Sequence, residues 1–137
     1  MDIVAHALWI NLVFLKNRKR GLAVLCGILP DIIAFSPVFV YVILMGIRDW
    51  TQGFSVKILA DYANISYNIT HSLLIFLVAY IIIYLMTKKK NIILFGWALH
   101  ILIDIPTHYE VFHPPLYLYP FKGLIVDGIR WNLPTFM

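Results

Sequence analysis

The stretch "LHILIDIPTH" (residues 99–108) places an ionisable side chain at every fourth position of a strongly apolar segment. Residues four apart lie on the same face of a helix, so His100 and Asp104 share a face, and His108 extends the stripe beyond Pro106. A polar side chain removed from water costs free energy unless it is paired or binds a metal. The stretch therefore predicts an apolar helix that carries a polar functional site along one side.

The rest of the chain is also apolar. Hydrophobic residues make up 61% of the 137 positions, charged residues make up 13%, and the mean hydropathy is +0.83. Soluble domains carry about 25% charged residues. We therefore predict one all-α domain, a polytopic membrane protein whose surroundings are lipid. The net charge of +4 comes largely from "KNRKR" (16–20) and "KKK" (88–90), which we interpret as cytoplasmic loops and not as nucleic-acid patches.

Placing both basic loops on the cytoplasmic side gives a topology with the N-terminus outside. The apolar runs and their flanks predict four transmembrane helices, over residues 2–16, 21–36, 70–87 and 91–107. The first helix lacks a basic leading region and a cleavage site, so we expect it to be retained and not to act as a signal peptide.

The two remaining segments are predicted to lie on the outer side. Residues 37–69 form an outer segment that includes an interfacial helix. Pro37 is expected to interrupt the backbone hydrogen bonding, and the apolar stretch after it could extend the second helix, bend along the surface or re-enter. Residues 108–137 are rich in proline and aromatic residues, which predicts an irregular C-terminal cap at headgroup level.

The basic loops also give the depth of the polar residues. At 1.5 Å per residue, His6, Asp31 and His100 lie about 15 Å from the nearest basic loop, Asp104 about 21 Å and His71 about 25 Å. In a hydrocarbon core about 30 Å thick, all five fall between the midplane and the outer surface. The sequence therefore predicts that four different helices bring imidazoles and carboxylates to one site, which opens towards the outer leaflet.

Imidazoles and carboxylates from separate helices are a ligand set that Zn²⁺ prefers, with Mn²⁺ or Fe²⁺ as alternatives. Bound metal would also neutralise the carboxylates and use the imidazole lone pairs. Any one of these residues could instead pair with a neighbouring helix. In the predicted outer cap, Arg130 and Lys122 are candidates for binding an anionic substrate group, although both could simply anchor the cap at the interface.

Five short motifs carry a resemblance to a known family. They are "AHALW" (5–9), "LPD" (29–31), "THSLL" (70–74), "HILID" followed by "PTH" (100–108), and "YPF…VDGIRW" (119–131). Their order resembles the small membrane-bound metal-dependent hydrolases of the LexA-regulated type, which look distantly similar to zinc-dependent phospholipase C and P1 nuclease. The resemblance implies a prokaryotic cell membrane and a site for two or more zinc ions.

Carried over residue by residue, the resemblance implies that the chain uses six metal ligands: His6, Asp31, His71, His100, Asp104 and, as the natural extra ligand, His108. Two departures reduce the available ligands and phosphate-binding cations. Ile33 stands where many members have a second acid, and Ser66 and Tyr67 stand where many have His-Arg. For this chain we therefore expect one to two zinc ions.

The predicted function is a metal-dependent hydrolase of a phosphoester in a lipid or lipid-linked substrate. A metal-activated water would be the nucleophile, and Asp31 and Asp104 would be catalytic. Membrane lipid is then both environment and possible substrate, and the sequence predicts no oligomeric state. A metal-ion transporter or channel is an alternative, but it would need ionisable groups across the inner half of the membrane. A haem-binding membrane protein is another, although haem iron does not need the two carboxylates.

Overall fold

The computed structural model describes residues 2–45, 54–108, 116–121 and 128–129. The described elements are α1 (Ile3–Val13), α2 (Arg20–Met45), α3 (Phe54–Thr70), α4 (Leu73–Thr87), the 3₁₀ turn η2 (Ile92–Leu94) and α5 (Phe95–Thr107). All regular structure in these residues is helical, which confirms the predicted all-α class for the described part of the chain.

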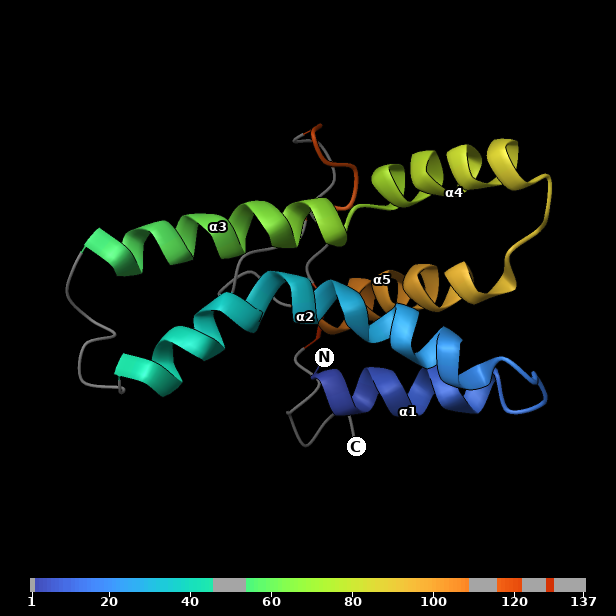
Figure 1. Cartoon of the computed structure of the whole chain (residues 1–137), viewed down its shortest axis with the longest axis horizontal. Helices are drawn as coiled ribbons and strands as arrows, with labels where there is room; N and C mark the ends of the chain where they lie inside the picture. The colour runs from blue at the N-terminus through green and yellow to red at the C-terminus, as the bar shows by residue number, and fades with distance from the viewer. Residues whose placement is uncertain (1, 46–53, 109–115, 122–127, 130–137) are drawn as a thin grey trace.

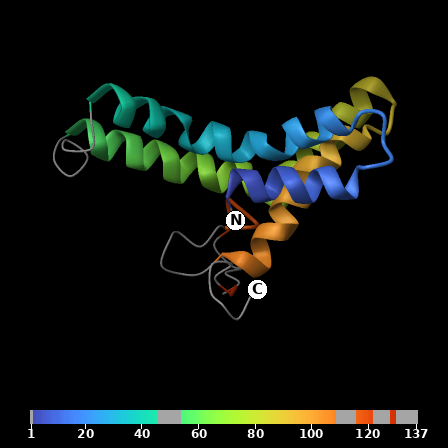
Figure 2. The same cartoon turned by 90° about the horizontal axis from the view of Figure 1, so that it is seen from below.

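The molecule is elongated, and its helices lie roughly along one direction (Figure 1). α1 and α5 lie beside the first half of α2, α3 runs back along the second half, and α4 continues from α3 beside α5 (Figures 1 and 2). The α1–α2 and α4–α5 connections, which carry the two basic clusters, lie at the same end of the molecule (Figure 1). The N-terminus of α1 and the C-terminus of α5 consequently meet near the middle of α2.

α2 extends beyond the boundary that we predicted at residue 36. It stays helical through Pro30 and Pro37 and ends at Met45. Pro37 has no backbone N–H, so the carbonyl of Ile33, one turn earlier, lacks its usual intrahelical donor. The hydroxyl of Tyr62 on α3 donates to that carbonyl at 3.1 Å. Of the paths left open by the sequence, the structure follows the one in which the apolar stretch extends the second helix, and α3 supports it.

The described helices differ in whether they could cross a membrane. α2 is long and apolar enough to do so, and α3 with α4 passes the same test only as a pair bent by 60°. α1 has 11 residues, about 17 Å of helix against a hydrocarbon core of about 30 Å. The described residues therefore contain one candidate span, or two with the bent pair, and the four predicted crossings stay a prediction.

The break between α3 and α4 places His71 outside regular helix. Ser72 caps α4 by accepting a hydrogen bond from the N–H of Ile75 at 3.3 Å. The Leu73 N–H donates to the carbonyl of Tyr117 at 2.8 Å, and the Ser72 hydroxyl donates to the carbonyl of Tyr119 at 3.1 Å. Two carbonyls from residues 116–121 thus accept hydrogen bonds from Ser72 and Leu73, and these bonds stabilise the break between α3 and α4.

A close helix contact sets the position of α5 against α2. A Cβ atom added to Gly96 on α5 would collide with the Ala23 carbonyl of α2, so only glycine allows this approach. Ile10, Phe14 and Ala23 form the apolar core beside the contact. This packing brings the polar face of α5 towards the middle of α2.

Candidate metal centre

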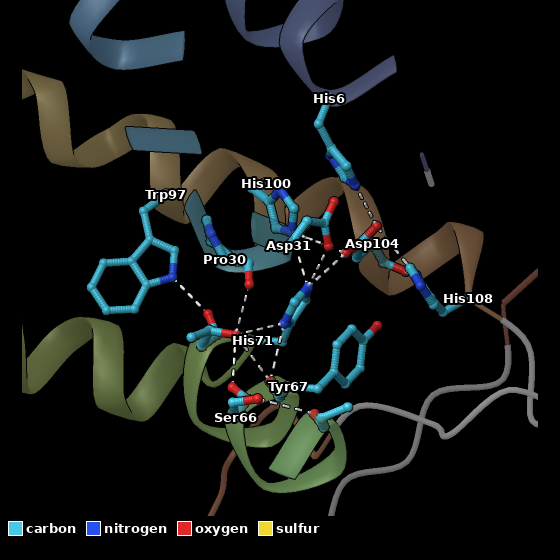
Figure 3. A network of polar contacts seen from close by, with 12 residues as sticks. His6, Pro30, Asp31, Ser66, Tyr67, His71, Trp97, His100, Asp104 and His108 are labelled. Atoms are coloured by element: carbon cyan, nitrogen blue, oxygen red, sulfur yellow. Dashed lines mark hydrogen bonds and ion pairs between the residues drawn. The ribbon is translucent and has the colours of Figure 1, made fainter. Parts of the chain in front are cut away.

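The structure brings together the six residues that the sequence proposes as metal ligands (Figure 3). They are His6 in α1, Asp31 directly after Pro30 in α2, His71 in the α3–α4 break, His100 and Asp104 one turn apart in α5, and His108 at the end of α5. Four chain segments that are far apart in sequence therefore meet at this point.

The cluster is buried, with one partly exposed member. His6, His71, His100 and Asp104 are fully inaccessible, and Asp31 is 6% exposed. The His108 side chain is 20% exposed, the most of the six, and we call this side of the cluster its rim. Burying so many ionisable groups is costly unless each is paired or a cation is shared between them.

Four ligand atoms converge at the centre of the cluster. His71 Nε2 lies 3.0 Å from His100 Nε2, 3.5 Å from Asp31 Oδ1 and 3.4 Å from Asp104 Oδ2. His100 Nε2 lies 3.8 Å from Asp31 Oδ1 and 3.4 Å from Asp104 Oδ2. Four zinc ligands at their usual bond lengths in a tetrahedron lie about 3.3 Å from one another. The separations that involve His71 or His100 are close to this spacing, so the buried groups could surround a metal ion.

The backbone of α3 orients the His71 ring. Its Nδ1 lies 3.0 Å from the Tyr67 carbonyl and 3.1 Å from the Thr70 hydroxyl oxygen. Because a carbonyl only accepts hydrogen bonds, this contact places the proton of the neutral ring on Nδ1. The lone pair on Nε2 then points at the other ligand atoms, the orientation typical of a metal-binding histidine. Trp97 Nε1 supports the arrangement by donating to the Thr70 carbonyl at 2.7 Å.

Asp104 contacts ligand nitrogens with both carboxylate oxygens. Oδ2 faces His71 and His100, whereas Oδ1 lies 3.0 Å from His6 Nε2 and 3.2 Å from His108 Nδ1. The His6 ring stacks on His100, with ring centroids 3.8 Å apart. The cluster therefore contains two adjoining groups of ligand atoms, and Asp104 belongs to both.

The donor set fits a metal ion. Imidazole nitrogens and carboxylate oxygens are ligands of Zn²⁺ and of other divalent transition metals. A neutral His71 would direct its Nε2 lone pair at two carboxylates, an unfavourable arrangement that a shared cation reverses. The buried residues could therefore hold a metal ion, and the geometry alone does not distinguish zinc from manganese or iron.

Sequence reasoning missed three residues that support His71. Tyr67 precedes His71 by four residues. This spacing could have indicated the contact, because residues four apart share a helix face. Thr70 is the direct neighbour of His71. Nothing in the sequence context of Trp97 indicates its hydrogen bond to the Thr70 carbonyl.

The predicted substrate-binding cations, Arg130 and Lys122, lie outside the described residues, as does most of the predicted cap over 108–137. Two described cap residues attach to the end of α5. The Gly128 N–H donates to the His108 carbonyl at 2.8 Å, and the Ile129 N–H donates to the Pro106 carbonyl at 2.8 Å. The described part of the cap thus approaches the rim of the cluster.

Comparisons with protein-family models, with curated proteins and with solved structures find no match. The class that the fold and the site define is therefore an all-helical, strongly apolar protein with a buried His/Asp cluster able to hold a metal ion.

Proposed function

We propose that the protein is a membrane-embedded, metal-dependent hydrolase that acts on a phosphoester of a lipid or lipid-linked substrate. The observation that carries this proposal is the convergence of four ligand atoms, at separations of 3.0–3.8 Å, from three parts of the chain. The ordered sequence motifs that resemble membrane-bound metal-dependent hydrolases point to the same residues.

The metal is proposed to be zinc, with one to two ions. His71, His100 and Asp31 would hold the first ion, which leaves a fourth position for water. His6, His108 and Asp104 Oδ1 would hold a second. Bound metal would supply a Lewis acid and an activated water nucleophile. Asp31 and Asp104 would keep that nucleophile oriented by hydrogen bonding while they neutralise the positive charge.

A lipid substrate is supported by the surface of the protein. Large apolar side chains on α2 and α4 point outwards, among them Ile43 at 78% and Met86 at 80% exposed. Exposed apolar surface on this scale is typical of a membrane or protein interaction site, and a bilayer would cover it. A substrate already in the bilayer would reach the cluster at its His108 rim, where Arg130 and Lys122 are proposed to bind its anionic group.

The first test is metal analysis of the full chain purified in detergent. Wild-type protein should contain stoichiometric zinc or a similar metal, and Asp104→Asn and His100→Ala should each weaken zinc binding by at least about tenfold. Loss of a residue that only hydrogen-bonds a metal ligand already lowers metal affinity by about tenfold or more, so loss of a ligand itself should do at least as much. Asp61→Asn is the matched control, because Asp61 is an exposed carboxylate on α3. Wild-type protein without metal would indicate that protons, and no cation, link the carboxylates, and would refute the proposal.

The second test separates an enzyme from a passive metal binder. Detergent-solubilised protein should hydrolyse members of a panel of phosphodiesters and phosphomonoesters, and a chelator should abolish this activity, because the nucleophile depends on the metal. Re-addition of zinc should restore it. Stoichiometric metal with no chelator-sensitive hydrolysis would favour a transporter or storage role.

A further inference from the structure

Two buried tyrosine hydroxyls have no hydrogen-bond partner in the described part of the chain. Tyr67 on α3 is 6% exposed and Tyr117 is fully buried. Neither phenol oxygen has a partner among the residues that the structure describes. Buried tyrosine hydroxyls normally find one, because an unpaired buried donor loses its hydrogen bonds to water without replacement. Each of these O–H groups could therefore donate a hydrogen bond to a ligand.

Tyr67 lies against the metal-ligand cluster. Its ring stacks on His71, with centroids 3.8 Å apart, and its centroid is 6.1 Å from that of His108. Figure 3 shows its hydroxyl directed towards the side of the cluster where Asp104 and His108 lie. The Tyr67 carbonyl also contacts His71, so both ends of the residue are held in place. This hydroxyl, unpartnered within the described residues, therefore lies on the His108 side of the cluster.

Tyr117 reaches the same region from the C-terminal part of the chain. Its carbonyl accepts hydrogen bonds from the Leu73 N–H at 2.8 Å and the Ser72 hydroxyl at 3.4 Å, directly beside His71 in sequence. The Asp104 carboxylate adds to burial in raising the pKa of Tyr117, which places the Tyr117 phenol within electrostatic range of the cluster. Burial raises the pKa of Tyr117, so its hydroxyl keeps its proton at neutral pH and remains a donor.

We propose that the hydroxyls of Tyr67 and Tyr117 donate hydrogen bonds to an anionic phosphoryl oxygen of the substrate beside the metal centre. This inference rests on the proposed function and assigns the two residues that would position the substrate. A phosphoryl group has non-bridging oxygens that remain after one of them approaches the metal. Neutral phenols can bind these oxygens in a buried site without the desolvation cost of an additional charge.

The test measures binding of inorganic phosphate to the zinc-loaded full chain in detergent by calorimetry. Tyr67→Phe and Tyr117→Phe remove only a hydroxyl and keep the ring, so packing is preserved. Each should weaken phosphate binding by about tenfold, because a hydrogen bond to a charged group is worth that much, and zinc content should be unchanged. Tyr84→Phe on the exposed surface of α4 is the matched control and should bind phosphate as the wild type does.

A second arm replaces inorganic phosphate with dodecyl phosphate in the same micelles. Tighter binding of dodecyl phosphate, with the same sensitivity to the two variants, would assign the phosphoryl group to a lipid headgroup. Equal affinity for the two probes, with that sensitivity retained, would assign it to free phosphate.

Two outcomes would overturn the inference and are distinguishable from failure of the proposed function. Unchanged phosphate affinity in both variants, with normal zinc, would show that the hydroxyls do not contact the anion. A parallel loss of zinc would make the two tyrosines supports of the metal ligands and not substrate donors. Absence of zinc from the wild-type protein would refute the proposed function, and the inference that rests on it would also be refuted.

Discussion

The cluster at the middle of the molecule and the surface of α4 have opposite characters. At the cluster, three histidines and Asp104 are completely buried. α4 has no buried residue at all, although it is the most apolar helix, and Ile82 and Met86 are 51% and 80% exposed. Soluble proteins show the reverse distribution. The contrast indicates that apolar burial contributes little to holding α4, whereas polar contacts and close packing hold the centre.

The same contrast occurs along α2. Its most apolar window is only 28% buried, whereas a core helix of a soluble protein is mostly buried. Near its middle, Asp31 enters the cluster, and further along Ile43 and Leu44 are 78% and 75% exposed. One helix thus presents a carboxylate to the interior and aliphatic side chains to the surroundings. This pattern supports the proposed location in lipid.

The largest predicted effect comes from placing a charge on the apolar exterior, because it should impair membrane insertion. Leu77 on α4 is 50% exposed, and we expect Leu77→Lys to reduce membrane insertion by about 3 kcal/mol, the usual cost of a lysine at the centre of a span. An insertion assay in microsomes measures this. Leu77→Ala is the control, because it shortens the side chain without adding charge. Equal insertion of the two variants would mean that this face contacts water.

The interior should be less tolerant of added volume than the exterior is. Gly96→Ala would push a methyl group into the Ala23 carbonyl and separate α5 from α2, so it should lower the free energy of unfolding by about 2 kcal/mol. Gly21→Ala is the matched control, since a Cβ there meets nothing within 4 Å. Denaturant titration in mixed micelles gives both values. A Gly96→Ala variant as stable as Gly21→Ala would contradict the close approach of the two helices.

The smallest predicted effect concerns Tyr62, a residue of α3 that makes a polar contact with the apolar second half of α2. Its hydroxyl donates to the Ile33 carbonyl, which Pro37 leaves without a helical donor. Tyr62→Phe should therefore lower the free energy of unfolding by about 1 kcal/mol. Zinc content should not change, because Tyr62 is not a member of the cluster. Unaltered stability in the same titration would mean that the carbonyl does not depend on this donor.

Several features could be predicted from local sequence because local physics controls them. Long apolar runs with few charges indicate helices, and the four-residue spacing places His100, Asp104 and His108 on one side of α5. The depth of His6 and Asp31 follows from the helical rise counted from the basic loops. These arguments also place His71 close to the others, although nothing local indicates that it occupies a break between two helices.

Other features depend on contacts between distant segments, which no local pattern encodes. The continuation of α2 beyond Pro37 depends on a hydroxyl from α3. The length of α1 and the bend before α4 depend on capping and on the docking of residues 116–121, so the number of membrane crossings could not be read from hydropathy alone.

Residue types and helical spacing were enough to identify which side chains carry the polar chemistry, because the cost of burying ionisable groups limits where they can occur. Only the packing of the helices established that Asp104 presents its two oxygens to different histidines. It also left the hydroxyls of Tyr67 and Tyr117 without a partner among the described residues. Side-chain direction depends on how neighbouring backbones approach, and that is a property of the assembled structure.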